Sequence, residues 1–343
     1  MDKYVDYAVK QAEALLNIDS PSGYTTKVTQ YLLDELTSLG YEPYRSVKGG
    51  VVVSLGGKDK EDGLFLEAHV DTLGAMVAEI KSDGRLRVTN IGGMNANNAE
   101  AENVRVHTRD NKIVEGTCQL INPSVHVNGD YDKTDRKWST VEIVLDEPVE
   151  SKENVDNLGI QVGDFVCFEP RFRVTESGYI KSRFLDDKLS AAALLAYAKY
   201  LADNSITPER AVYLHFTVFE EVGHGGAASV PEGVTEAISV DMGCVGEGLT
   251  CTEREVSICV KDSGGPYHYD VVGGLIDAAK QSGAHYALDV YPYYGSDVEC
   301  TLGAGHDIKH GLIGPGVFAS HGYERSHKRA VESTLKVIAT YVK

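Results

Sequence analysis

The sequence contains little cysteine, proline or tryptophan. Its 343 residues include 6 Cys, 10 Pro and 1 Trp. No two cysteines form a Cys-x-x-Cys pair, which argues against a disulfide framework or a zinc ribbon and favours buried thiols in a reducing compartment. At roughly 150 residues per domain, the chain is long enough for about two domains and a large buried core. A disulfide-stabilised miniprotein is therefore excluded.

Positive charge and long apolar runs are also scarce. Lys and Arg number 33 against 51 Asp and Glu, a net charge of -18 that repels nucleic acid and anionic lipid. The most apolar stretch, 189–202, is interrupted by Lys199 and is shorter than the roughly 20 residues of a membrane helix. The first residues show no basic segment followed by an apolar one, so we expect no targeting peptide and a cytoplasmic location. Neither nucleic acid nor a membrane is an expected partner.

Helix and strand patterns alternate along most of the chain. Apolar residues at helical spacing predict helices at 3–16 and about 25–39, followed by apolar strands at 51–55 and 64–68. After residue 186 the pattern predicts helices at 187–202, 267–281 and about 326–341, and strands at 211–219, 236–240, 285–291 and 312–318. Short segments separated by Gly, Asn and Asp turns fill the part between. We expect an α/β fold with a doubly wound mixed sheet built from residues 1–74 and 174–343, and a small all-β domain inserted at 75–173.

Several predicted strands end at a residue that could bind a metal ion. These residues are His69 and Asp71, Glu220 and Glu221, Asp241, and His321, and the pair Asp186–Asp187 opens the helix after the insert. Ligands of open α/β sheets bind at the carboxyl ends of the strands, so these side chains should converge. Nitrogen and oxygen donors without thiolate are typical of a site that binds Zn, Co or Mn for catalysis, and not of a structural zinc site.

Each of these motifs also has an ordinary structural interpretation. A His-x-Asp at a strand end is more often a surface hydrogen-bonded pair, and acidic residues in the first turn of a helix are ordinary partners of its dipole. Adjacent Glu220 and Glu221 after an apolar run are the stronger signal, because two such carboxylates are costly unless a cation neutralises them.

The remaining histidines give weaker signals. His306 and His310 are crowded by glycines, and we expect His107 and His126 to be surface groups of the insert. Gly223 and its neighbours argue against a metal role for His224. His327 falls inside the predicted last helix, which makes His321 the better ligand.

The order of the motifs resembles a known family over the whole chain. The motifs are Ser20-Pro21-Ser22-Gly23, His69-Val70-Asp71, Leu185-Asp186-Asp187-Lys188, Glu220-Glu221-Val222-Gly223, Asp241-Met242-Gly243 and Ser320-His321. Together with the β insert they resemble the dinuclear metallo-aminopeptidases of the glutamyl aminopeptidase and deblocking (tetrahedral) aminopeptidase family. The resemblance implies a zinc-exopeptidase (phosphorylase/hydrolase-like) architecture.

The resemblance also implies roles for seven residues. It implies two divalent metal ions per subunit, with zinc expected and cobalt or manganese as alternatives. One ion would be held by His69 and Asp241, the other by Glu221 and His321, with Asp186 as the bridge. Glu220 would be the general base, and Asp71 would orient His69. The resemblance further implies a cis bond between Asp186 and Asp187.

The implied activity is removal of the N-terminal residue from peptides with a free N-terminus. The family implies self-association, up to a dodecameric shell, in which we expect the insert to make subunit contacts or control substrate access. Lys188, His224-Gly225 and the segment after His321 depart from the usual motifs, so no preferred N-terminal residue is assigned. The alternatives are a two-metal N-acyl-amino-acid or amide deacylase on the same scaffold, a glycosidase using the paired glutamates, and a shell-forming or binding protein without catalysis. The glycosidase is disfavoured because adjacent strand residues point to opposite faces.

Overall fold

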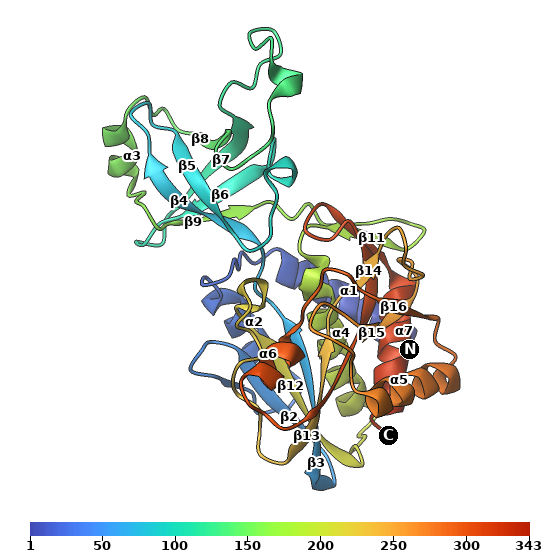
Figure 1. The fold of residues 1–343 in the computed structure, drawn as a ribbon. Helices are drawn as coiled ribbons and strands as arrows, with labels where there is room; N and C mark the ends of the chain where they lie inside the picture. Colours follow the sequence, from blue (N-terminus) through green and yellow to red (C-terminus); the bar gives the residue numbers. More distant parts are fainter. The chain divides into compact units, whose positions relative to one another are not determined.

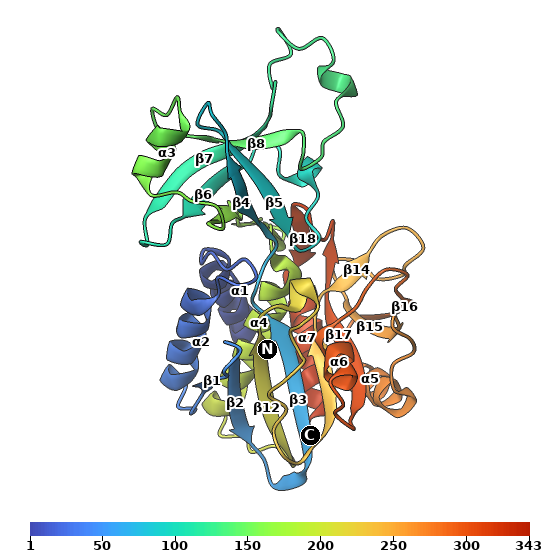
Figure 2. The same cartoon turned by 60° about the vertical axis from the view of Figure 1, so that its left-hand side comes forward.

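A computed structural model describes residues 1–343, which form two compact units. The larger unit consists of Met1–Asp71 and Arg171–Lys343, and the smaller one of Thr72–Pro170. Figures 1 and 2 show both as ribbons.

The larger unit is built on one mixed sheet of 12 strands. The strands along its main path are, in spatial order, β1 (Tyr44–Arg45), β2 (Val51–Gly56), β12 (Arg210–Thr217), β3 (Asp59–His69), β13 (Val234–Val240), β17 (Lys309–Phe318), β18 (Glu324–His327), β11 (Tyr179–Ser182) and β10 (Arg173–Val174). Strands β14 (Gly243–Val245) and β15 (Val256–Lys261) also pair with β17, and β16 (Tyr286–Val290) pairs with β15. Parallel and antiparallel neighbours both occur, which confirms the expected mixed α/β sheet.

Six α-helices belong to the same unit (Figure 2). They are α1 (Asp2–Leu16), α2 (Thr26–Ser38), α4 (Leu185–Asp203), α5 (Tyr269–Ser282), α6 (Asp297–Gly303) and α7 (Lys328–Tyr341). Helix α4 packs against α1, α7 and β3 and is buried around nearly its whole circumference, which explains its lack of an amphipathic pattern. No helix of the structure is both long enough and apolar enough to cross a bilayer.

The parallel register aligns the carboxyl ends of the central strands. Thr217 of β12 lies opposite His69 of β3, and Val240 of β13 lies opposite Ile313 of β17. The segments that follow these strands therefore leave the sheet at one edge, as the positions of the polar residues predicted.

The smaller unit is a closed barrel with strand order β4 (Gly74–Ile80), β5 (Leu86–Ile91), β8 (Val141–Leu145), β7 (Ile113–Leu120), β6 (Asn103–His107) and β9 (Phe165–Phe168). It also contains a short helix, α3 (Lys152–Leu158), which the sequence pattern did not predict. Ser151 caps this helix by accepting a hydrogen bond from the Asn154 N–H, and Gly159 ends it in the left-handed conformation.

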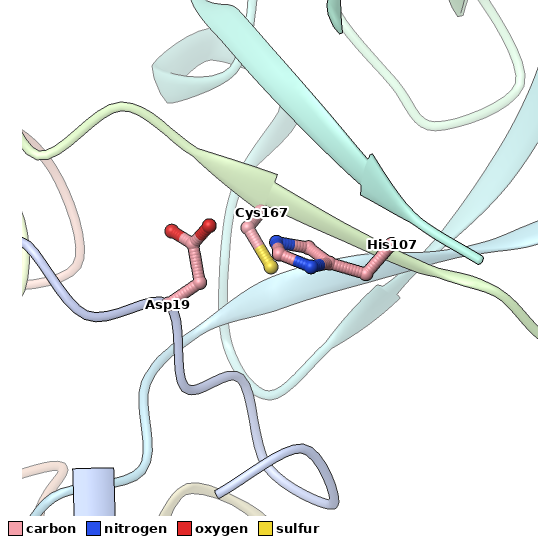
Figure 3. Close-up of side chains that lie close together, drawn as sticks. All are labelled: Asp19, His107 and Cys167. Atoms are coloured by element: carbon pink, nitrogen blue, oxygen red, sulfur yellow. The ribbon is translucent and has the colours of Figure 1, made fainter. Parts of the chain in front are cut away.

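Two of our predictions about histidines are wrong. His107 is 5% exposed rather than a surface group, because it ends β6 beside β9, where Cys167 is also buried (Figure 3). His327 ends β18 and caps α7, which begins at Lys328, so it does not lie inside the helix. The strand β18 was missed because its four residues, Glu-Arg-Ser-His, carry no apolar alternation.

Candidate metal centre and active site

His69 lies at the end of β3 and is 1% exposed. Its Nδ1 lies 3.0 Å from the main-chain oxygen of Asp71. Since a carbonyl can only accept, Nδ1 carries a proton and donates it to this oxygen. Nε2 lies 3.0 Å from Oδ1 of Asp186 and 3.6 Å from Oε2 of Glu220. The ring is therefore oriented with Nε2 toward the carboxylates.

Asp186 lies between the two imidazoles of the site. Its Oδ1 is the oxygen near His69, and its Oδ2 lies 3.5 Å from Nε2 of His321. Asp186 and Asp187 depart from helical backbone angles at the start of α4, Phe184 before them is left-handed at φ 66°, and the bond between the two aspartates is cis as expected. The Asp186 carboxylate thus faces two histidines, one at the end of β3 and one in the segment after β17.

Asp187 lies in the site together with Asp186, as the sequence predicted for the pair, although no ligand role was assigned to it. Both of its carboxylate oxygens are buried without a hydrogen-bond partner. It forms a group with His69 and Asp241 whose ligand atoms all lie within 4.8 Å of one another. Burial, and then the charge of Asp241, raises the pKa of this carboxyl well above its ordinary value. A buried carboxylate of this kind is costly unless a cation compensates it.

Glu220 and Glu221 lie on a 3-10 turn after β12, so they follow the strand as predicted, but the strand geometry used against a glycosidase does not describe them. The N–H groups of both residues donate to the carboxylate of Asp71, at 3.1 and 3.4 Å, and the Ser22 hydroxyl donates to it as well. Oε2 of Glu221 lies 3.6 Å from Nε2 of His321. Glu221 also belongs to a second group of possible metal ligands, with His69 and Asp186, that does not include Glu220.

His321 follows β17 in a left-handed conformation, with φ 63°. Glu324, which is 2% exposed, accepts the N–H of His321 at 2.9 Å with one oxygen and the N–H of Asp186 at 3.1 Å with the other. Burial, and next the charge of Asp186, raises the pKa of Glu324 to about 8. Glu324 thus connects the two segments that carry Asp186 and His321.

Asp241 directly follows β13 and is 5% exposed. One of its oxygens accepts the N–H of Met242, whose main-chain oxygen accepts the Tyr294 hydroxyl at 3.1 Å. Burial, followed by the charge of Asp186, raises the pKa of Asp241 to about 7.

The buried site contains more carboxylates than cationic partners. Burial is the main cause that raises the pKa of both Glu220 and Glu221 well above the ordinary value. A hydrogen bond to Asp186 raises the pKa of His321 to about 10. Burial lowers the pKa of His69, but the charge of Glu220 and the neighbouring aspartates outweigh it and raise the pKa overall. Imidazole and carboxylate donors with unpartnered oxygens fit divalent Zn, Co or Mn.

The structure thus brings together all seven residues that the sequence singled out. Asp187, Glu324 and Tyr294 join them. The histidines of the smaller unit belong to the barrel, and we assign them no part in this site.

Comparisons with known proteins agree with the fold and with the motifs. The chain belongs to the M42 glutamyl aminopeptidase family, whose pattern matches residues 49–337. It is accordingly an aminopeptidase, a hydrolase of peptide bonds. The YhfE protein of Bacillus subtilis (strain 168) is 44% identical over 328 residues, which is 96% of this chain and 95% of that protein.

Two solved structures share the fold. Aminopeptidase APDkam598 from the archaeon Desulfurococcus kamchatkensis superposes with a TM-score of 0.88 at 23% identity, over 99% of this chain and 95% of that one. The Pyrococcus horikoshii TET1 peptidase, which can assemble into a tetrahedron or a large octahedral shell, gives a TM-score of 0.86 at 23% identity, over 98% and 99% of the two chains. At this level of identity the likeness shows the fold alone.

Proposed function

We propose that this aminopeptidase binds two divalent metal ions and uses Glu220 as its general base. The proposed ligands are His69 and Asp241 for one ion, Glu221 and His321 for the other, and Asp186 between them. The observation that carries the proposal is the position of the Asp186 carboxylate, whose two oxygens lie 3.0 and 3.5 Å from the Nε2 atoms of His69 and His321.

The donors present in the site fit such ions. The orphaned oxygens of Asp187 support a cation on the side of His69 and Asp241. When bound, two ions of this kind lower the pKa of a water molecule and polarise the scissile carbonyl. Zinc is the expected metal, with cobalt or manganese as alternatives.

The residues of the chain then act in sequence. Glu220 takes a proton from the attacking water as its oxygen bonds to the carbonyl carbon. The carbon–nitrogen bond breaks, and Glu220 returns the proton to the leaving amine. Asp71 is a positioning residue: its carboxylate holds the N–H groups of Glu220 and Glu221, and its main-chain oxygen orients His69.

Peptides with a free N-terminus are the proposed substrates. A site dominated by carboxylates attracts the positive charge of an α-amino group and does not attract an acylated one. This charge favours an aminopeptidase over a deacylase. The preferred N-terminal residue is not part of the proposal.

We further propose self-association in the cytoplasm. The tetrahedral and octahedral assemblies of the Pyrococcus horikoshii TET1 peptidase, which shares the fold, support a closed oligomeric shell, and the dodecamer stays the expected size. Size determination of the purified protein by light scattering tests the self-association. The assignment of residues 75–173 to subunit contacts or substrate access remains a separate prediction.

A panel of aminoacyl anilides tests the function. The protein is treated with a chelator, and Zn, Co or Mn is then added back to separate portions. We expect activity only after re-addition, and only on substrates whose α-amino group is free. N-acetylated anilides serve as matched controls. Hydrolysis of the acetylated series in preference to the free one would replace the aminopeptidase with the deacylase, and full activity after complete metal removal would refute the metal mechanism.

A further inference from the structure

Tyr294 lies beside the site in a loop between β16 and α6. The loop is fixed to Ser263 by two hydrogen bonds: the Tyr294 N–H donates to the Ser263 hydroxyl at 2.9 Å, and the Ser263 N–H donates to the Tyr294 carbonyl at 3.1 Å. The ring of Tyr294 packs against that of Tyr291, with centroids 5.0 Å apart. Tyr294 is half-buried, so its side chain is held in place and still reaches the surface.

The hydroxyl of Tyr294 lies next to the segment that carries the proposed ligand Asp241. It donates to the main-chain oxygen of Met242, the residue after Asp241, at 3.1 Å. A phenol has an ordinary pKa of about 10 and is protonated at neutral pH. Rotation about the C–O bond can direct the O–H proton to another acceptor without moving the ring.

A neutral donor is unusual among the groups at this end of the site. The groups close to His69 and Asp241 include the carboxylates of Asp186, Asp187 and Glu220. Ionised carboxylates only accept hydrogen bonds, and the imidazole of His69 is already directed at Asp71 and Asp186. The ammonium group of Lys188 donates to the main-chain oxygens of Leu15 and Ile18. The Tyr294 hydroxyl is thus the group positioned to donate toward a substrate.

Such a donor assists peptide hydrolysis beside the metal ions. When water adds to the scissile carbonyl, negative charge develops on the carbonyl oxygen, and a pre-positioned donor stabilises this charge. The reacting carbon must lie near Glu220, whose carboxylate is 3.6 Å from His69, and Asp241 has a ligand atom within 4.8 Å of the same imidazole. A carbonyl held between Glu220 and Asp241 would therefore bring its oxygen toward the Tyr294 hydroxyl, which is bonded to the residue after Asp241.

We propose that Tyr294 is a catalytic residue whose hydroxyl donates a hydrogen bond to the scissile carbonyl oxygen in the transition state. The proposal rests on the proposed function. The water oxygen bonds to the carbonyl carbon, and the π electron pair moves to the carbonyl oxygen, which accepts the hydrogen bond. Tyr294 keeps its proton throughout. When the pair returns, the carbon–nitrogen bond breaks and the proton held by Glu220 goes to the amine.

The test compares Tyr294→Phe with Tyr293→Phe in the full-length, metal-loaded protein. Tyr293 is 94% exposed and provides the matched control for loss of one phenolic oxygen. The measurements are kcat and KM on an aminoacyl anilide, metal content, and calorimetric binding of a phosphonic-acid peptide analogue that mimics the tetrahedral state. For Tyr294→Phe we expect kcat to fall about 100-fold, KM to stay within about threefold, and metal content to stay at the native level. Binding of the analogue should weaken by a similar factor, and Tyr293→Phe should match the native protein in every measurement.

Three results would overturn the proposal. An unchanged kcat excludes the role, and an increase in KM alone shows that Tyr294 binds substrate in the ground state. Loss of a metal equivalent from Tyr294→Phe shows that the hydroxyl only supports Asp241. Failure of the proposed function looks different, because the native protein itself would then hydrolyse no free aminoacyl anilide. In that case the binding of the analogue is the measurement that tests the role of Tyr294. If Tyr294→Phe binds the analogue as tightly as the native protein, the hydroxyl makes no contact with the tetrahedral state.

Discussion

The two adjacent glutamates should separate catalysis from metal binding. Glu221 is 4% exposed at its side chain, and its Oε2 lies 3.6 Å from Nε2 of His321, whereas Oε2 of Glu220 lies 3.6 Å from His69. Only Glu221 belongs to a group of possible ligands within 4.8 Å of one another. We therefore predict that Glu221→Gln loses one metal ion, and that Glu220→Gln keeps both but loses the proton transfer.

The two expected magnitudes have different origins. Removing one carboxylate charge about 4 Å from a cation costs about 4 kcal/mol per unit of cation charge at an effective dielectric constant of about 20. At about 1.4 kcal/mol per tenfold, binding of a divalent ion is therefore weakened by at least about 1000-fold. Loss of a general base lowers the rate by about 100-fold to 10,000-fold without removing a ligand.

Metal content by mass spectrometry, measured beside kcat, distinguishes the two variants. At micromolar free metal, Glu221→Gln should hold one ion per subunit and Glu220→Gln two. The substitutions are isosteric and adjacent, so each variant is the control for the other. If Glu220→Gln has lost an ion while Glu221→Gln retains both, the assignment of base and ligand is reversed. If both variants keep two ions and full kcat, neither glutamate has the role proposed.

Four further predictions follow from the same geometry. Asp186→Asn should abolish measurable activity and remove most bound metal while the protein remains soluble, and full metal occupancy in this variant would contradict its bridging role. Glu324→Gln should weaken metal binding about 10-fold to 100-fold, as loss of a supporting group typically does. The side-chain amide can accept only one of the N–H groups of Asp186 and His321 that Glu324 accepts. An unchanged metal titration would argue against the connection of Asp186 to His321. A variant lacking residues 75–173 should change its assembly state on light scattering, and a variant that keeps both assembly and activity would leave the insert without the proposed role. Between about pH 6.5 and 8, the metal-free protein should lose thermal stability as pH rises, because folded groups with raised pKa values bind protons that the unfolded chain releases. These groups have pKa values of about 7 for Asp241, about 8 for Glu67 and Glu324, and about 10 for His321. A Tm that rises over this pH range would refute the sign of the effect.

The sequence predicts the fold correctly where an apolar run is followed directly by polar residues. The strand that ends in His69 and the strand that precedes Asp241 were both predicted, since an unbroken apolar run is typical of a strand buried on both faces. Short polar elements such as β18 and the helix α3 carry no such pattern and were missed. Buried His107 was misjudged because a single histidine in a β region gives no sign of which face it occupies.

The supporting residues of the site were hidden for a different reason. Glu324 occurs in a polar stretch, where an acidic residue is normally solvated, and its burial depends on the pairing of β17 with β18. Asp187 follows Asp186 at a helix start, where acidic residues are ordinary. Tyr294 belongs to a loop whose position depends on Ser263, which is 31 residues away in the sequence. Such roles come from tertiary contacts, which no local pattern encodes.

Buried carboxylates outside the proposed ligand set hold the site in its geometry before any cation binds. Phe184, Phe219 and His321 all adopt left-handed backbone angles, with φ of 66°, 73° and 63°, at the three places where the chain turns into the site. Each such residue costs on the order of 1–3 kcal/mol and persists only where the surrounding structure enforces it. Asp71 and Glu324 supply that constraint, because each accepts two main-chain N–H groups from these turns. A substitution at either residue should therefore impair metal binding without removing a proposed ligand.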